Sequence, residues 1–98
     1  MSKLINSKDF DKLVRESKGF VLVDFYADWC GPCRMLGPIM DEVSESNTVY
    51  KVNVDDNQEL AMEFGIMSIP CVICFKDGKE YKRLIGLRSK EDILDMLK

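Results

Sequence analysis

The segment Phe20–Tyr26 constrains the fold more than any other part of this sequence. Its residues are apolar apart from Asp24, and most of them are β-branched or aromatic. An apolar run of this length and composition is typical of a strand that is buried on both faces. Such a strand needs cover on each face, and helices packed on the two sides of a sheet provide it. The segment therefore predicts a central strand in a sheet that lies between two layers of helices.

Predicted strands and helices alternate along the rest of the chain. Apolar periodicity and turn residues predict strands at residues 4–5, 20–26, 48–54, 71–75 and 81–85, with Asp77-Gly78 as the tight turn of the last hairpin. Helices are predicted from the N-cap Ser7 to a stop at Gly19, from Pro32 onward with a kink at Pro38, over residues 57–64 before Gly65, and from the cap Ser89. The order β-α-β-α-β-α-β-β-α predicts an α/β fold with a mixed sheet. At 98 residues, the chain is expected to form one domain, 1–98.

The composition excludes several classes of function. The chain contains no histidine, which removes Ser-His and Cys-His nucleophile pairs and imidazole metal sites. Its net charge of −3 provides no basic field for nucleic acid or anionic lipid. The apolar stretches are shorter than the ~18–20 residues that span a bilayer. Because no apolar signal segment follows Met1, we expect a cytoplasmic protein.

The chemistry is expected to reside in the cysteines. In a reducing compartment, cysteines are more often catalytic or metal-binding than structural. Cys30 and Cys33 are separated by Gly31-Pro32 and lie where the central strand gives way to a predicted helix. This spacing lets the two sulfurs close a disulfide ring, and the helix start favours the thiolate form of Cys30. We therefore expect Cys30 to attack a partner disulfide and Cys33 to resolve the mixed disulfide.

A zinc site is the alternative explanation of the cysteines, because Cys71 and Cys74 repeat the same spacing. The gap between the two pairs exceeds the usual ~15–20 residues. Cys71 and Cys74 also lie in a predicted strand, where residues three apart point to opposite faces. These features favour redox chemistry and predict no metal. A redox-inactive or metal-binding interaction module remains the alternative function.

The motif Trp29-Cys30-Gly31-Pro32-Cys33 resembles that of the thioredoxin family. Matching segments cover nearly the whole chain: residues 23–28, 37–39, 51–55, 65–66, 68–70 and 75–78, with Gly86 beyond them. The resemblance implies the thioredoxin fold, a central mixed sheet with helices on both faces. It also implies a protein-disulfide reductase that acts through a mixed disulfide and is recharged by a thioredoxin reductase. No cofactor is implied beyond the Cys30–Cys33 disulfide, and we expect a monomer.

Further residues gain roles from the resemblance. Asp24 is expected to be buried, with a raised pKa, and to exchange protons with Cys33; the alternative is an exposed edge-strand position. Lys51 is implied to be its half-buried partner, although the pattern alone favours a solvated lysine. Pro70 is implied to be a cis proline opposite Cys30, although it could simply mark a strand start. The docking surface for partners is expected to comprise Trp29, Gly31, Pro32, Ile66, Ile69, Pro70, Ile85, Gly86 and Leu87.

Two positions depart from the family pattern beside Pro70. Cys71 replaces a usual threonine, and we expect it to lie near Cys30 by the docking groove and to act as a redox modulator. Cys74 is expected on the other face of its strand, as a small core residue. Ser68 replaces a frequent glycine and is expected to narrow the groove.

Overall fold

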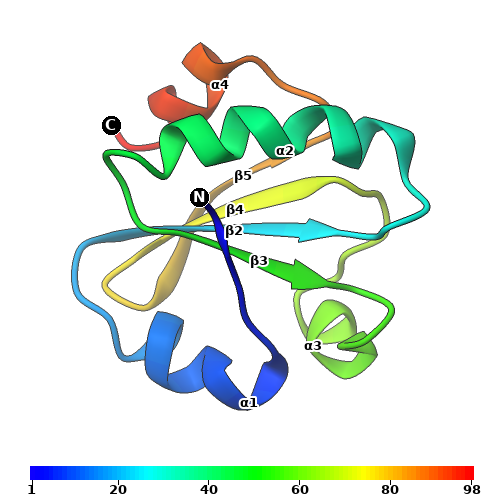
Figure 1. The fold of residues 1–98 in the computed structure, drawn as a ribbon. Helices are drawn as coiled ribbons and strands as arrows, with labels where there is room; N and C mark the ends of the chain where they lie inside the picture. Colours follow the sequence, from blue (N-terminus) through cyan, green and yellow to red (C-terminus); the bar gives the residue numbers. More distant parts are fainter.

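Strand β2 (Phe20–Tyr26) lies at the centre of a five-stranded sheet in the computed structural model, which describes residues 1–98 (Figure 1). The strand order is β1-β3-β2-β4-β5. Strands β1 and β2 pair parallel with β3, whereas β4 runs antiparallel to both β2 and β5. The other strands are β1 (Lys3–Leu4), β3 (Val49–Asn53), β4 (Cys71–Lys76) and β5 (Lys79–Ile85). The predicted mixed sheet is confirmed, and the central strand has the predicted bounds.

The helices follow the predicted order but differ at some ends. They are α1 (Ser7–Phe10), continued by a π-helical segment (Asp11–Arg15), then α2 (Gly31–Val43), α3 (Gln58–Glu63) and α4 (Lys90–Asp95). Ser7 was expected as the first cap, but the cap is Asn6, whose side chain accepts the N–H groups of Lys8 and Asp9. Gly19 lies beyond the end of this helix, directly before β2, and has a positive φ. Helix α2 continues through Pro38, and Ser89 caps α4 as predicted.

Alternate side chains of β2 enter two separate cores, one on each face of the sheet. Val21, Val23 and Phe25 pack with residues of α1 and α3, whereas Leu22 packs with residues of α2 and α4. Figure 1 shows α1 and α3 on one side of the sheet and α2 and α4 on the other. Because side chains alternate along a strand, Asp24 shares the face of Leu22 and lies beneath α2. The fold thus places a carboxyl group under the helix that carries the cysteines.

The β2–α2 junction meets the start of β4 and the end of β5 at one edge of the molecule. The Ile69–Pro70 peptide bond directly before β4 is cis, as the resemblance implied. The carbonyl oxygen of Pro70 accepts the N–H of Gly86 at 2.8 Å, which ties the end of β5 to this segment. Residues far apart in the sequence therefore surround the cysteine motif.

The hairpin between β4 and β5 packs against the end of the first helical segment. Gly78 has a φ of +84°, and a Cβ at this position would overlap the carbonyl oxygen of Arg15. Gly19 has a similar φ of +76°, but a Cβ there would meet nothing within 4 Å. A side chain at Gly19 would therefore incur only the cost of a left-handed backbone. A side chain at Gly78 would incur that cost and a steric clash with Arg15.

We predict that Gly78→Ala destabilises the protein more than Gly19→Ala. The Gly19 variant is expected to lose about 1–2 kcal/mol, the cost of an L-residue in the left-handed region. The Gly78 variant must in addition move the hairpin away from Arg15. Urea unfolding midpoints of the two variants test this difference. Equal losses would show that the hairpin does not depend on this close contact.

Candidate active site

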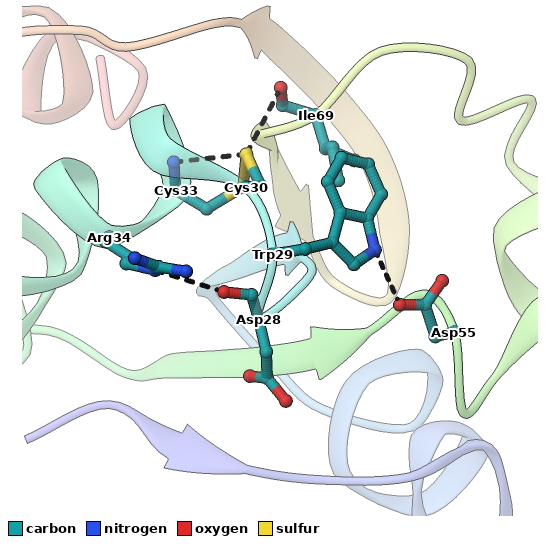
Figure 2. The surroundings of a disulfide bond; sticks show 7 residues. All are labelled: Asp28, Trp29, Cys30, Cys33, Arg34, Asp55 and Ile69. Carbon is teal, nitrogen blue, oxygen red and sulfur yellow. Dashed lines mark hydrogen bonds between the residues drawn. A yellow bond between two sulfur atoms is a disulfide. The ribbon is translucent and has the colours of Figure 1, made fainter.

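Cys30 and Cys33 form a disulfide at the start of α2 (Figure 2). Cys30 is the N-cap residue of this helix, with an extended backbone (φ −87°, ψ 112°). Its Sγ accepts the backbone N–H of Cys33, with a sulfur–nitrogen distance of 3.2 Å. A helix start offers unpaired N–H groups and a partial positive charge. When the disulfide opens, this arrangement stabilises a thiolate at Cys30.

The two sulfurs have different surroundings, although both residues are almost fully buried. Cys30 is 4% and Cys33 is 5% exposed, so exposure does not distinguish an attacking from a resolving cysteine. The Sγ of Cys30 lies 3.8 Å from the carbonyl oxygen of Ile69, next to the cis proline (Figure 2). Cys33 instead lines a pocket that it shares with Asp24. The Cys30 sulfur thus lies next to the segment that contains Ile69, whereas Cys33 lies next to the pocket that contains Asp24.

Asp24 is buried beneath α2 with incomplete hydrogen bonding. It is 4% exposed, and its Oδ1 atom has no hydrogen-bond partner. Burial raises the pKa of Asp24 from 3.8 to about 7, and the charge of Lys51 acts in the opposite direction. The pocket beside it has a volume of about 260 Å³, and Asp28, Arg34 and Lys51 in its lining offer hydrogen-bond partners for water. This carboxyl group is therefore poised to take up or release a proton near neutral pH.

Lys51 is half-buried next to Asp24, but the two residues form no ion pair. Their strands place them opposite one another in the parallel register of β2 and β3. No nitrogen–oxygen contact within 4.0 Å joins the two side chains. The Nζ atom of Lys51 lies over the ring of Tyr26 instead, 5.6 Å from its centroid. Tyr26 thus also belongs to the site, a role that no pattern of residues in the sequence predicted.

The residues expected to form the docking surface differ in exposure. Five are exposed: Trp29, Gly31, Pro32, Ile85 and Leu87. Ile69 and Gly86 are half-buried, and the side chain of Ile69 packs against the cluster that contains Cys30. Ile66 is half-buried and packs against the large core, and Pro70 is buried. These last two residues support the surface from beneath more than they form it.

Two further apolar side chains close in sequence to the site residues are exposed, and the sequence motifs did not include them. Met67 is 95% exposed and directly precedes the Ser68-Ile69-Pro70 segment, and Met35 is 64% exposed on α2. The only sequence signal was their position beside residues already assigned to the site.

Trp29 is 67% exposed and is held by a carboxylate from the other side of the loop. Its indole Nε1 donates to Oδ2 of Asp55 at 2.8 Å (Figure 2). The Nε of Arg34 donates to the carbonyl oxygen of Asp28 at 3.1 Å, which joins the first turn of α2 to the loop before the cysteines. These contacts hold the loop before Cys30 at both of its sides. Asp55 carries no local sequence signal, because only the pairing of β2 and β3 brings it to Trp29.

The expected position of Cys71 beside the docking groove is not what the structure shows. Cys71 is 1% exposed and packs in the large core cluster, whereas Cys30 belongs to a separate small cluster with Ala27 and Cys33. Burial raises the pKa of the Cys71 thiol, which makes it a poorer nucleophile. These observations favour a core role over the modulating role expected from the sequence. Cys74 lies in the core on the opposite face, as predicted.

The cysteines are not arranged as a metal centre. Cys71 and Cys74 belong to clusters on opposite faces of the sheet, so they cannot share one ion. No group of three or more Cys, Asp or Glu side chains is placed to hold a metal.

The helices are too short or too polar for any of them to traverse a lipid bilayer.

Comparisons with known proteins agree with this geometry. A model of the thioredoxin family matches residues 1–98. The chain is 43% identical over 100 residues to a thioredoxin of Chlamydia pneumoniae, covering 99% of this chain and 96% of the relative. It is 44% identical over 101 residues to a thioredoxin of Mycoplasmoides gallisepticum, and the match covers 100% of both chains.

Solved structures include a close match to the fold. A mutant thioredoxin from Halobacterium salinarum superposes with a TM-score of 0.91 at 34% identity, over 98% of this chain and 87% of the other. A disulfide at the start of a helix, a neighbouring cis proline and a buried carboxyl group thus occur in a chain whose full length matches one family. The chain belongs to the thioredoxin family and is a thiol–disulfide oxidoreductase of the protein-disulfide reductase type.

Proposed function

We propose that Cys30 is the attacking nucleophile and Cys33 the resolving thiol of the reductase. The Cys30 thiolate attacks one sulfur of a target disulfide, and the displaced target thiolate takes up a proton. Cys33 then loses its proton and attacks the Cys30 sulfur, which releases the second target sulfur as a thiol. The reaction transfers two electrons to the target and leaves the Cys30–Cys33 disulfide. The observation that carries this assignment is the N–H of Cys33 directed at the Cys30 sulfur.

Asp24 is the proposed acceptor of the Cys33 proton. Both residues line the same pocket, through which water can connect them. With a pKa of about 7, the Asp24 carboxyl group is partly ionised at neutral pH and can both accept and donate a proton. Lys51 is its proposed electrostatic partner, because its positive charge lowers the pKa of Asp24.

The exposed apolar residues around the disulfide are the proposed contact surface for partners. Target proteins and a thioredoxin reductase both need access to Cys30, so they share this surface in turn. The exposed side chains of Trp29, Ile85 and Leu87 would form the centre of this surface. The hydrogen bond from Gly86 to Pro70 holds Ile85 and Leu87 beside the cis proline. An extended target segment would lie along the backbone of Ile69, whose carbonyl oxygen is 3.8 Å from the Cys30 sulfur.

The proposed setting is the cytoplasm, with the protein acting as a monomer. Cys71 and Cys74 are unpaired thiols, as is usual in a reducing compartment. The disulfide itself is the only redox group that the proposed reaction uses. The thioredoxin reductase then returns two electrons to the Cys30–Cys33 pair.

The roles of the two cysteines can be tested by trapping. We predict that Cys33→Ser accumulates a mixed disulfide between Cys30 and an insulin chain, because nothing is left to resolve it. Cys30→Ser is expected to trap nothing under the same conditions. Mass spectrometry of the non-reduced adducts identifies the linked residue. Trapping by the Cys30 variant would reverse the assignment.

Limited alkylation tests the same assignment in the reduced protein. Near pH 7, with little reagent, Cys30 is expected to react well before Cys33, because the helix start stabilises its thiolate. Cys71 and Cys74 are expected to react only after unfolding, since both are buried in the cores. Labelling of Cys71 in the native protein would restore it as a candidate redox modulator.

Burial of Asp24 predicts a specific pH dependence of stability. Between pH 4 and pH 7 the folded protein keeps the proton and the unfolded chain loses it, so stability falls as pH rises. Relative to wild type, Asp24→Asn should therefore gain on the order of 4 kcal/mol between pH 4 and pH 8, at about 1.4 kcal/mol per pH unit. Urea unfolding of both oxidised proteins across this range measures the difference. Parallel pH profiles would contradict the raised pKa.

The proton-transfer role of Asp24 predicts a kinetic effect that also depends on pH. At pH 7, Asp24→Asn should slow single-turnover reduction of a peptide disulfide by roughly tenfold or more, because Cys33 loses its general base. The deficit should shrink above about pH 9, where a free thiol ionises without help. Stopped-flow rates at several pH values provide the measurement. A deficit that does not depend on pH would point to altered packing of the site.

A further inference from the structure

Lys51 occupies a position that its charge alone does not explain. It lies opposite Asp24 in the strand register, and a lysine stem is long and flexible enough to reach a carboxylate there. Its Nζ atom nevertheless makes no ion pair with Asp24 and lies over the ring of Tyr26, 5.6 Å from the centroid. A distance below ~6 Å is within the range of cation–π attraction.

Tyr26 is well placed to hold the ammonium group. It is the diagonal neighbour of Lys51 on the same face of the sheet, since Asp24 pairs with Lys51 and Tyr26 pairs with Asn53. The ring itself has little freedom, because Tyr26 is half-buried and packs against the cluster of Ala27, Cys30 and Cys33. A fixed aromatic face therefore competes with Asp24 for the mobile charge of Lys51.

We propose that Tyr26 is a positioning residue that holds the Lys51 ammonium over its ring and out of direct contact with the Asp24 carboxylate. At that position the positive charge acts on Asp24 only from a distance. A direct ion pair would hold Asp24 in its charged form and make it a weaker proton acceptor. The aromatic ring thus preserves the ability of Asp24 to exchange protons near neutral pH. This inference rests on the proposed role of Asp24 in the reaction.

Several other groups surround this arrangement and belong to the same electrostatic balance. Asp28 after β2, and Cys33 and Arg34 on α2, line the pocket. Asp41 on α2 interacts with the charge of Lys51, and Asp56 acts on the Tyr26 hydroxyl. Cys71 on β4 lies in the opposite core, and its thiol interacts with the charge of Asp24. None of them forms an ion pair with Asp24 or Lys51. The charge of Lys51 also contributes to the lowered pKa of Asp41, after the hydrogen bond from Ser2. Lys51 is the one positive group that the strand register places directly beside Asp24.

The test follows the titration of the Asp24 carboxyl carbon by NMR in the oxidised protein, with no turnover involved. Tyr26→Leu removes the ring, and we expect the Asp24 midpoint to fall by roughly one pH unit as Lys51 moves into contact. Tyr26→Phe keeps the ring and is expected to retain the wild-type midpoint. Lys51→Met is expected to raise the midpoint, because it removes the positive charge.

The double variant Tyr26→Leu/Lys51→Met separates the proposal from simple hydration. Without Lys51, the loss of the ring should no longer lower the Asp24 midpoint. An equal fall in both backgrounds would mean that water entering the pocket causes the effect, and it would overturn the proposal. An unchanged midpoint in Tyr26→Leu would overturn it as well.

A measurement on the wild-type chain guards against variants that fold poorly. The side-chain protons of Lys51 next to Nζ should show an upfield ring-current shift in wild type and in Tyr26→Phe. Ordinary lysine shifts in both would overturn the proposal. Because neither readout requires disulfide exchange, failure here would leave the roles of Cys30 and Cys33 intact. Conversely, loss of the trapping result would leave the Tyr26–Lys51 contact in place.

Discussion

The burial of strand β2 on both faces is the constraint on which the rest of the structure depends. Its alternating side chains fill two cores, so helices must pack on each side of the sheet. The chain passes from the carboxyl end of β2 into α2 within a few residues, which places Cys30 at the helix start. The same alternation puts Asp24 under α2. One strand thus determines the position of both the proposed nucleophile and the proposed proton acceptor.

This arrangement is unfavourable for stability at one point. A carboxyl group that is 4% exposed and has an unpartnered oxygen costs free energy, and a hydrophobic residue would pack there at lower cost. The nearby Lys51 could offset part of this cost through an ion pair, but none is formed. The site therefore keeps a carboxyl group whose charged form is disfavoured by burial. Perturbed pKa values of this kind are common at functional sites.

Local signals allowed the sequence to predict most of the fold. The apolar run of β2, the turn at Asp77-Gly78 and the cap Ser89 each depend on a few adjacent residues, and the structure has all three features. The first cap was assigned to Ser7 instead of Asn6 because both residue types cap helices well, and one residue of displacement leaves the pattern almost unchanged. Contacts between segments were not predictable in this way. Trp29 with Asp55 and Tyr26 with Lys51 follow from the pairing of β2 with β3, and periodicity does not specify strand register.

Cys71 shows how a correct neighbour relation can still mislead. It directly follows the cis Pro70, whose preceding carbonyl lies by the Cys30 sulfur, so proximity along the chain suggested a thiol at the active site. Successive side chains of a strand point to opposite faces of the sheet, however. The side chain of Cys71 points into the core that contains Phe25 and Ile73. Alternation along the strand correctly predicted that Cys71 and Cys74 lie on opposite faces of the sheet. It does not say which of the two faces each cysteine occupies. That choice depends on the pairing of β4 with β2, because this register determines the face of every residue in β4.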